Sequence, residues 1–497
     1  MGIGGCGMAG LAQMLKQAGC IVSGSDRVES YVLDSLRKLG IDIFIGHRTE
    51  QLEGVDYLVF SSAITAENVL LKTAIERNIP SFHRAVLLAK LIRATQDQLI
   101  LILGSHGKTT TTGLGISVLT TAGLDPGYAI GATYYASGLN ANLGAGKFFI
   151  LEGDESDRSF ECFQPNIIIL NNIDADHLES YGYSLEQLKI AYLNFIKKSF
   201  LENPNLVLIL NYSDFHVREL ISRLTPSGIK LLTYGLALDS NFNFNLNFNL
   251  NLITPDGVLS KINVFPDKTD FFIRFKNIKN IKNIKNIENI GSDYSVALPG
   301  RHNALNAAGV LLMGEILNIP HETQKIGLRT YQGVSRRSEI IGEYQFSGKN
   351  FLLMEDYGHH PAEIMATVKA LKEAYPNKRL VLIFQPHRYT RTQSLEKEFI
   401  TALSVSEIDV LFLLEIYPAS ELPIENINSK QLIKKIKQEK IKDIKDIKDI
   451  FYLESLASIP EALAQIIQSG DLVLLQGAGD IHEGVAWLRT HWATYKK

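Results

Sequence analysis

Short apolar runs alternate with segments of helical length along most of the chain. Residues 99–103 and 148–151 contain no polar residue at all. Uninterrupted runs of this length are typical of strands that are buried on both faces of a parallel sheet, and helix-length segments between them favour βαβ units. The pattern predicts an α/β fold with parallel sheets.

The βαβ pattern occurs in three parts, and 497 residues are too many for a single core. We expect domains at 1–96, 97–332 and 333–497. The first begins with a glycine-rich turn, a helix near 11–17 and a strand over 20–26. The third has predicted strands at 351–354, 380–384, 410–414 and 472–475, and a helix at 361–373.

Three repetitive segments interrupt this order. Asparagine alternates with Phe or Leu over 241–252, a Lys-Asn-Ile triplet repeats over 276–290, and Ile-Lys-Asp repeats over 440–450. We interpret them as insertions in surface connections, near 237–292 and 428–450, because added loop length costs little free energy. A lysine-rich patch for nucleic acid is the less favoured alternative.

The composition excludes several classes of protein. Hydrophobic residues make up 45% and the net charge is −3, so no basic balance suggests a nucleic-acid partner. The sequence contains neither a run of eighteen apolar residues nor a signal-peptide pattern. Nothing in it therefore predicts an association with a membrane. The three cysteines lack metal-ligand spacing, which suits a reducing cytoplasm. We expect a monomer or a weak homodimer.

The segment 104–112, Gly-Ser-His-Gly-Lys-Thr-Thr-Thr-Thr, is the strongest chemical signal. It follows a buried strand and opens a predicted helix, so its backbone N–H groups can face a polyphosphate. Lys108 can reach the β- and γ-phosphates, and the Thr109 hydroxyl can bind Mg²⁺. Ile102 stands where the general phosphate-loop pattern has its first glycine, which indicates a tighter loop that begins at Gly104. A chance glycine turn is the alternative.

Carboxylates follow the next predicted strand. Glu152 is nearest the strand end and is our first candidate for Mg²⁺, whereas Asp157 fits a solvated acidic turn better. His177 follows a further strand at 166–170. It can bind a second divalent ion, although a hydrogen-bonded structural role is the more common one for such a histidine.

Other polar clusters predict binding sites. Asn303 and Asn306 share one helix face and can reach a base or ribose together. Arg336 and Arg337 lie at a predicted domain junction, where a guanidinium can bind phosphate or form a surface ion pair. Two further clusters, 355–361 and 384–392, follow strands of the third domain, where ligands of open α/β sheets bind.

The opening glycine run contains Gly-x-Gly-x-x-Gly twice and suits a diphosphate. A dinucleotide site needs a strand before such a turn, and the sequence leaves no room for one before Gly2. A nucleotide sugar would satisfy these glycines as well as NAD would.

Taken together, these motifs resemble the Mur ligase family. The resemblance rests on the segments 2–10, 104–112, 152–157, 176–181, 300–306, 336–339, 356–361 and 385–392, in this order along the chain. It implies a three-domain architecture with a Rossmann-like domain for a UDP-sugar, a central phosphate-loop ATPase domain and a Rossmann-like domain for an amino acid. The implied substrates are UDP-N-acetylmuramate and L-alanine, and the implied cofactors are ATP and Mg²⁺.

The resemblance also implies roles for individual residues. Lys108, Glu152 and His177 would be catalytic, and Thr109, Glu152 and His177 would hold Mg²⁺. The nucleotide would be bound by Gly104, Ser105, His106, Gly107, Lys108, Thr109, Thr110, Asn303, Asn306, Arg337 and Asp356. The substrates would contact Gly4, Gly5, Gly7, His387, Arg388 and Arg391.

Three other functions compete with this one. A relative that reattaches a recycled tripeptide to the same UDP-sugar would share most motifs, although the cluster 387–391 favours alanine. A decayed ligase would bind nucleotide without catalysis, but the intact Lys108, Glu152 and His177 argue against decay. An NAD-dependent oxidoreductase would leave the phosphate loop unexplained.

We predict that Lys108→Ala abolishes phosphate release from ATP and leaves the fold intact, because the variant lacks the cation that binds the β- and γ-phosphates. Phosphate release and circular dichroism measure the two effects. Unchanged turnover would remove the phosphate loop from the mechanism.

Overall fold

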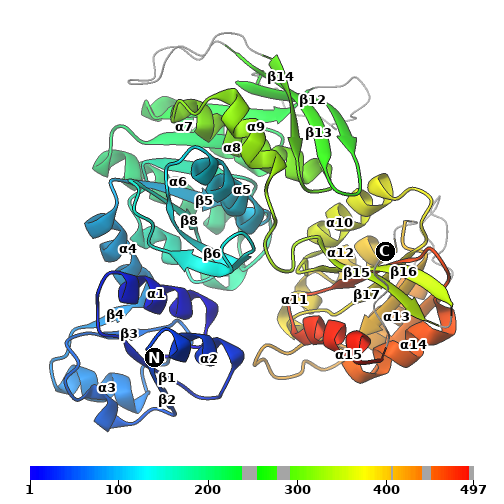
Figure 1. Ribbon diagram of the computed structural model, residues 1–497, viewed down its shortest axis with the longest axis horizontal. Helices are drawn as coiled ribbons and strands as arrows, with labels where there is room; N and C mark the ends of the chain where they lie inside the picture. Colours follow the sequence, from blue (N-terminus) through cyan, green and yellow to red (C-terminus); the bar gives the residue numbers. More distant parts are fainter. Residues whose placement is uncertain (238–253, 277–290, 347, 405–406, 439–448, 492–497) are drawn as a thin grey trace. The chain divides into compact units, whose positions relative to one another are not determined.

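The computed structural model describes residues 1–237, 254–276, 291–346, 348–404, 407–438 and 449–491 (Figure 1). The chain forms two compact units. One comprises Met1–Ile262, Phe271–Val296 and Ala304–Gln332, and the other comprises Asn263–Asp270, Ala297–Asn303 and Gly333–Lys497. Most of the repetitive sequence lies outside the described residues.

A ten-stranded sheet organises the first unit. Within it, β5 (Gln98–Leu103) pairs in parallel with β8 (Phe148–Glu152) and β9 (Ile167–Leu170). Beyond β8 lie β6 (Gly127–Tyr134) and β7 (Leu139–Asn142), and beyond β9 lie β10 (Val207–Asn211), β11 (Lys230–Leu236), β12 (Gly257–Val264), β13 (Thr269–Phe275) and β14 (Gly291–Val296). The expected strands at 99–103, 148–151 and 166–170 are therefore confirmed.

Helices cover both faces of this sheet. Alternate residues of β5, such as Leu101, pack with α4 (Arg84–Thr95), α6 (Leu185–Glu202) and α7 (Phe215–Leu224). The intervening residues point to the opposite face. There α5 (Lys108–Thr121) approaches so closely that a Cβ on Gly115 would clash with Ile150. α8 (Arg301–Ile316) and α9 (His321–Arg329) complete this part of the chain.

The first ninety-odd residues contain two short parallel strand pairs. β1 (Ser23–Asp26) pairs with β2 (Asp42–Ile45), and β3 (Leu58–Phe60) pairs with β4 (Ser81–His83). The Met1 amino group donates to Val59 O at 2.6 Å and Gly2 N donates to Ser25 O at 2.8 Å. Met1 and Gly2 thus contact β3 and β1 through single backbone hydrogen bonds, and they form no strand of their own, in line with our expectation.

The helices of this segment are α1 (Cys6–Gln17), α2 (Tyr31–Lys38) and α3 (Val69–Glu76). α1 begins directly after Gly5, several residues before the start that its apolar positions predict. Glycine and alanine in its first turn give little periodic signal, which explains the difference.

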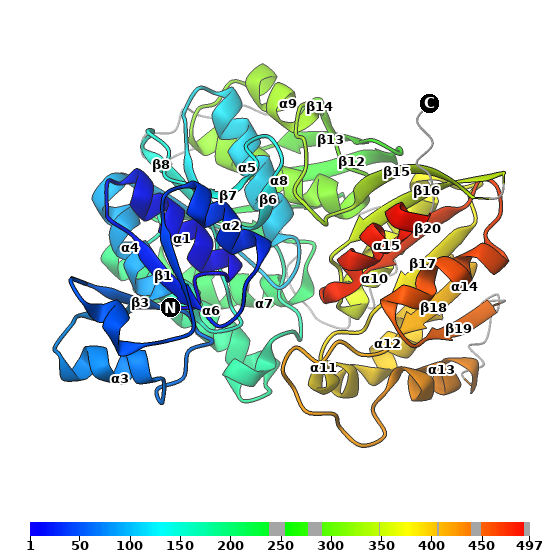
Figure 2. The same cartoon turned by 60° about the horizontal axis from the view of Figure 1, so that its bottom comes forward.

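A six-stranded sheet organises the second unit (Figure 2). Its order is β15 (Glu339–Phe346), β16 (Lys349–Asp356), β20 (Leu472–Gln476), β17 (Leu380–Phe384), β18 (Val410–Leu414) and β19 (Asp449–Leu453). β15 is antiparallel to β16, and the other neighbours are parallel. The four strands predicted for this part of the chain are all present.

Two helical layers enclose the second sheet. α10 (Pro361–Ala374), α12 (Glu396–Leu403) and α13 (Ser429–Gln438) pack on the face that contains Leu382. α14 (Ile459–Ile466) and α15 (Glu483–His491) pack on the face that contains Ile383. The segment 428–450, which we expected to be a surface insertion, therefore contributes a helix with one buried face at one end and the first residues of β19 at the other.

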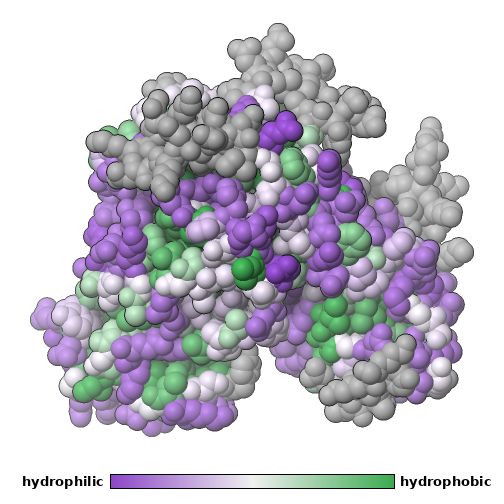
Figure 3. Space-filling view, turned by 45° about the horizontal axis from the view of Figure 1, so that its top comes forward, coloured by the Kyte–Doolittle hydropathy of each residue, from purple (hydrophilic) through white to green (hydrophobic). Residues whose placement is uncertain are grey.

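None of the helices in the described ranges is long and apolar enough to cross a membrane. The face drawn in Figure 3 mixes hydrophilic and apolar residues.

We predict that Leu382→Ala lowers the free energy of unfolding of the second unit by about 3 kcal/mol, because it leaves a cavity at a fully buried position. Trp487 lies in α15 of this unit, so urea unfolding followed by tryptophan fluorescence reports on it. Leu422→Ala is the matched control, because Leu422 is 86% exposed. Equal midpoints for the two variants would contradict the core assignment.

Candidate functional site

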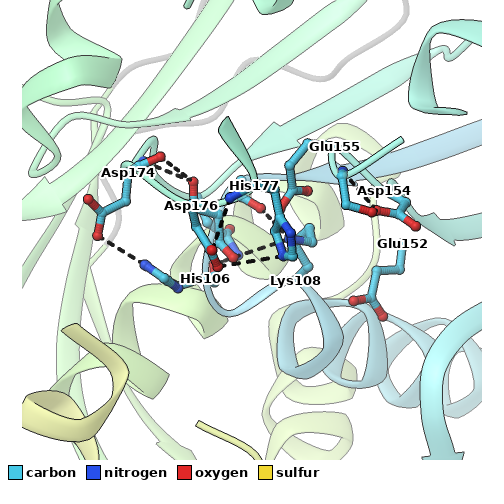
Figure 4. A network of polar contacts seen from close by, with 12 residues as sticks. His106, Lys108, Glu152, Asp154, Glu155, Asp174, Asp176 and His177 are labelled. Carbon is cyan, nitrogen blue, oxygen red and sulfur yellow. Dashed lines mark hydrogen bonds and ion pairs between the residues drawn. The ribbon is translucent and has the colours of Figure 1, made fainter. Parts of the chain in front are cut away.

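Three loops meet at the carboxyl ends of β5, β8 and β9 (Figure 4). They are the glycine loop 104–107, the acidic turn 152–157 and the segment 171–177. Because the three strands are parallel neighbours, their ends lie side by side. The predicted phosphate loop, the predicted carboxylate Glu152 and His177 are therefore brought together.

The glycine loop needs its two glycines for conformational and steric reasons. Gly104 has φ +131° and Gly107 has φ +76°, which side chains rarely adopt. A Cβ on Gly107 would also lie 2.7 Å from Asn306 Oδ1. Ile102, at the position of the absent first glycine, is fully buried in β5, so the loop is short and begins at Gly104, as predicted.

The segment after β9 fixes the glycine loop. Asn172 Oδ1 accepts from His106 N at 2.8 Å, and His106 Nε2 lies 3.0 Å from Asp174 Oδ2. Ser105 Oγ accepts from Asp174 N at 2.8 Å. Ser105 and His106 thus hold the loop in shape. Thr110, in the first turn of α5, is buried.

The Lys108 ammonium is almost enclosed. Its Nζ donates to Glu155 Oε1 at 2.8 Å, to Gly104 O at 2.6 Å and to Ser105 O at 3.2 Å. The side chains of Lys108 and Glu155 are only 14% and 2% exposed. Burial alone would lower the pKa of Lys108, but the charges of Glu155 and Glu152 outweigh it and raise that pKa. Lys108 is therefore a buried cation facing the loop.

Glu155 is a residue that sequence reasoning missed, although it lies in the acidic turn. Its Oε2 is buried and has no hydrogen-bond partner among the described atoms. Its backbone oxygen accepts from Tyr181 OH at 2.7 Å, which anchors the turn. The only available signal was its place within the Glu-Gly-Asp-Glu sequence after β8.

Thr109 and Glu152 form an oxygen-rich pair. Thr109 Oγ1 donates to Glu152 Oε1 at 2.8 Å, and Gly131 N donates to Glu152 Oε2 at 2.7 Å. Hydroxyl and carboxylate oxygens are the ligands that Mg²⁺ prefers, so this donor set fits that ion. His177 has a left-handed backbone and lies with Glu152 and Glu155 around Lys108 (Figure 4). Its Nε2 is 3.6 Å from Asp176 Oδ2.

The two asparagines of α8 have different surroundings. Asn303 Nδ2 donates to Pro299 O at 2.8 Å, in the loop before the helix. Asn306 is buried beside Gly107 of the phosphate loop. Their shared contact with a nucleotide stays a prediction.

The glycine run at the start of the chain is also held by an acidic side chain, that of Asp26. Gly4 N donates to Asp26 Oδ2 at 2.8 Å, and Gly5 precedes the first turn of α1. A Cβ on Gly7 would lie 3.0 Å from Arg84 Nη1, so this arginine lies close to the glycine run.

Arg84 connects the glycine run with the acidic turn. Its Nη2 lies 3.0 Å from Asp154 Oδ2 and 3.1 Å from Asp157 Oδ2. Burial would raise the pKa of Asp157, but hydrogen bonds from Ser159 and Ser62 outweigh it and lower that pKa. Asp157 is therefore an ion-pair partner, in place of the solvated turn residue that we expected. No sequence motif pointed to Arg84.

In the second unit, the residues predicted for the nucleotide surround the end of β16. Asp356 Oδ2 accepts from Ser338 N at 2.9 Å, and Asp356 Oδ1 accepts from Gly358 N at 2.8 Å. The Arg337 guanidinium lies 5.0 Å from the Tyr357 ring centroid. Asp356 thus organises the local backbone, and its contact with a nucleotide stays a prediction.

The residues predicted for the amino acid follow β17. The His387 ring stacks on Tyr417 with centroids 5.5 Å apart, and Arg391 Nη1 lies 3.2 Å from His387 Nδ1. Arg388 Nε donates to Glu421 Oε1 at 2.7 Å. The contact of His387, Arg388 and Arg391 with an amino acid stays a prediction, and the sequence motif gave no indication of Tyr417 or Glu421.

Comparisons with known proteins agree with these observations. Three family models match the chain: the catalytic domain of the Mur ligase family over residues 1–96, the Mur ligase middle domain over 102–314 and the Mur ligase glutamate ligase domain over 336–479. The chain is 37% identical over 484 residues to the UDP-N-acetylmuramate–L-alanine ligase of Legionella pneumophila strain Lens. That match covers 97% of this chain and 93% of the relative.

Solved structures show the same fold. The UDP-N-acetylmuramate-alanine ligase of Thermotoga maritima has a TM-score of 0.75 at 24% identity, with 99% of this chain and 97% of that chain covered. The murein peptide ligase of Psychrobacter arcticus has a TM-score of 0.65 at 19% identity, with 98% and 97% covered.

We predict that Glu155→Ala lowers the thermal midpoint of the first unit without nucleotide, because it leaves Lys108 buried without a counter-ion at a cost of about 3 kcal/mol. ATP phosphates would replace the lost charge, so ATP should raise the midpoint more in the variant than in the wild type. Calorimetry with and without ATP measures both shifts. Glu161→Ala, which removes a more exposed ion pair with Arg158, is the control. Equal ATP-induced shifts in Glu155→Ala and the wild type would contradict the role of Glu155.

Proposed function

Because the chain belongs to the Mur ligase family, we propose that it is an ATP-dependent ligase that joins L-alanine to the carboxylate of UDP-N-acetylmuramate. The observation that carries this proposal is the 37% identity to an L-alanine ligase over 97% of the chain. The phosphate loop with its buried Lys108 supports the ATP-dependent part. The product would enter peptidoglycan synthesis.

When ATP binds to the phosphate loop, its phosphates would replace the present partners of the Lys108 ammonium. Lys108 is neutralised by Glu155 and also donates to two loop carbonyls. The β- and γ-phosphates would offer stronger charge-assisted bonds to the same ammonium. The loop N–H groups at the start of α5 would complete the phosphate cradle. Gly104, Ser105, Gly107 and Thr110 fit this role through their place in the loop and first helical turn.

Thr109, Glu152 and His177 would hold Mg²⁺ beside the γ-phosphate. The ion would neutralise phosphate charge as the phosphoryl group transfers. Glu152 supports this role because Thr109 and Gly131 fix both of its oxygens at the end of β8.

The reaction needs an activated carboxylate, because an unactivated carboxylate oxygen is a poor leaving group. A carboxylate oxygen of the sugar attacks the γ-phosphorus and ADP leaves, which gives an acyl phosphate. The amine of alanine then attacks the acyl carbon, and phosphate leaves with the transferred oxygen as the amide forms. The protein contributes mainly positioning and charge stabilisation.

The remaining residues would position the three substrates. Gly4, Gly5 and Gly7 would lie beneath the UDP diphosphate, and Asn303, Asn306, Arg337 and Asp356 would contact the nucleotide. His387, Arg388 and Arg391 would face the amino acid. The guanidinium groups suit its carboxylate, because they offer paired N–H donors.

A second candidate is ligation of a recycled tripeptide to the same UDP-sugar. The likeness to the Psychrobacter arcticus murein peptide ligase favours this reading only at the level of the fold. We therefore prefer alanine.

We expect the purified protein to release phosphate from ATP, Mg²⁺ and UDP-N-acetylmuramate only when L-alanine is added, because the acyl phosphate needs an amine acceptor to turn over. A coupled phosphate assay gives the rate, and mass spectrometry of the product gives the added alanine. Tripeptide in place of L-alanine distinguishes the second candidate. Nucleotide binding without phosphate release under either condition would indicate a decayed ligase.

A further inference from the structure

The segment 417–421 lies along the residues that follow β17. Tyr417 N donates to Pro386 O at 2.8 Å, and Arg388 N donates to Tyr417 O at 2.8 Å. His387 and Tyr417 form a parallel bridge. The two segments follow the neighbouring strands β17 and β18, so this bridge extends the sheet past its regular end. Residues 387–388 are therefore held at the backbone level by residue 417.

Glu421 binds the same segment through its side chain. Its Oε1 accepts from Arg388 Nε at 2.7 Å and from Thr390 Oγ1 at 2.6 Å, and its Oε2 accepts from Thr390 N at 3.0 Å. Burial would raise the pKa of Glu421, but the hydrogen bonds from Thr390 outweigh it and lower that pKa. Glu421 is thus a charged, three-bond acceptor at neutral pH.

Arg388 adopts a backbone conformation that needs such support. Its φ is +72°, in the left-handed region that costs an ordinary residue about 1 kcal/mol or more. The backbone bond to Tyr417 and the side-chain bond to Glu421 both act on this residue. They fix the direction in which its guanidinium leaves the chain.

The ring of Tyr417 supports the neighbouring His387. The two rings are nearly parallel, at 12°. A Cβ on Gly479 would lie 2.6 Å from Tyr417 Cγ, so the turn after β20 packs directly against the tyrosine. The segment 417–421 therefore joins the loops that follow β17, β18 and β20.

We propose that Glu421 is a positioning residue that orients Arg388 toward the carboxylate of the amino-acid substrate. This inference rests on the proposed function, in which Arg388 faces the amino acid. Glu421 engages Nε, one edge of the guanidinium, and so sets the plane in which the terminal N–H groups can pair with a carboxylate. The segment 417–421 thereby determines selectivity for a free α-carboxylate.

The test compares Glu421→Ala and Glu421→Gln with the wild type in the phosphate-release assay. We expect Glu421→Ala to raise KM for L-alanine by tenfold or more, with kcat reduced less than threefold and KM for ATP and UDP-N-acetylmuramate within twofold. Glu421→Gln keeps a hydrogen-bond acceptor without the charge, so its KM for L-alanine should fall between those of the wild type and Glu421→Ala. Glu425→Ala is the matched control, because Glu425 is an exposed glutamate of the same loop.

L-alaninamide, which lacks the α-carboxylate, separates positioning from a general structural role. We expect the ratio of kcat/KM for L-alanine to that for L-alaninamide to fall at least tenfold in Glu421→Ala. A misfolded variant would lose both activities equally, which tryptophan fluorescence would detect. Thr390→Val, which removes one donor to Glu421, would then serve as the second variant, with an expected threefold rise in KM for L-alanine.

An unchanged ratio and unchanged KM for L-alanine in Glu421→Ala, or in Thr390→Val where the first variant misfolds, would overturn this inference alone. If the wild-type protein releases no phosphate in an L-alanine-dependent manner, the proposed function is overturned, and the inference about Glu421 is overturned with it.

Discussion

The buried charge of Lys108 is the constraint on which the first unit depends. An ammonium with so little exposure needs a counter-charge, because an isolated buried ion costs several kcal/mol. Glu155 supplies it from the turn after β8, and the loop carbonyls of Gly104 and Ser105 supply the remaining acceptors. β5 and β8 must therefore be adjacent and parallel for the loop to keep its shape. The rest of the ten-stranded sheet holds them so.

The same constraint prepares the loop for chemistry. A polyphosphate that reaches Lys108 replaces one anionic partner by another, so the ammonium stays neutralised throughout. Glu152, two residues before Asp154 in the same turn, has both oxygens engaged by Thr109 and Gly131. Glu155, the counter-ion of Lys108, and Glu152, the proposed Mg²⁺ ligand, thus lie in a single turn. β8 and the ion pairs of Arg84 fix the position of that turn.

Local patterns in the sequence were sufficient for the buried strands, such as 99–103, 148–151 and 380–384, and for the position of the glycine loop after β5. The role of Glu152 stays a prediction. Apolar runs mark buried strands, and glycines mark the tight turn, so both signals are contained within a few residues. Pairs that lie far apart in sequence could not be predicted in this way. Arg84 and Asp157 are 73 residues apart, and Arg388 and Glu421 are 33 apart. Such pairs depend on which strands become neighbours, and one sequence does not specify that order. The start of α1 at Cys6 was missed for a different reason, since its first turn has no apolar periodicity.

The fate of the carboxylate oxygen tests the central claim most directly, because a ligase of this kind must pass that oxygen to phosphate. UDP-N-acetylmuramate labelled with ¹⁸O in its carboxylate would be incubated with the protein, ATP, Mg²⁺ and L-alanine, and the released phosphate analysed by mass spectrometry. The account predicts one ¹⁸O atom in each phosphate formed with product. Phosphate without ¹⁸O, formed at the same rate as the amide, would contradict an acyl-phosphate ligation at this site.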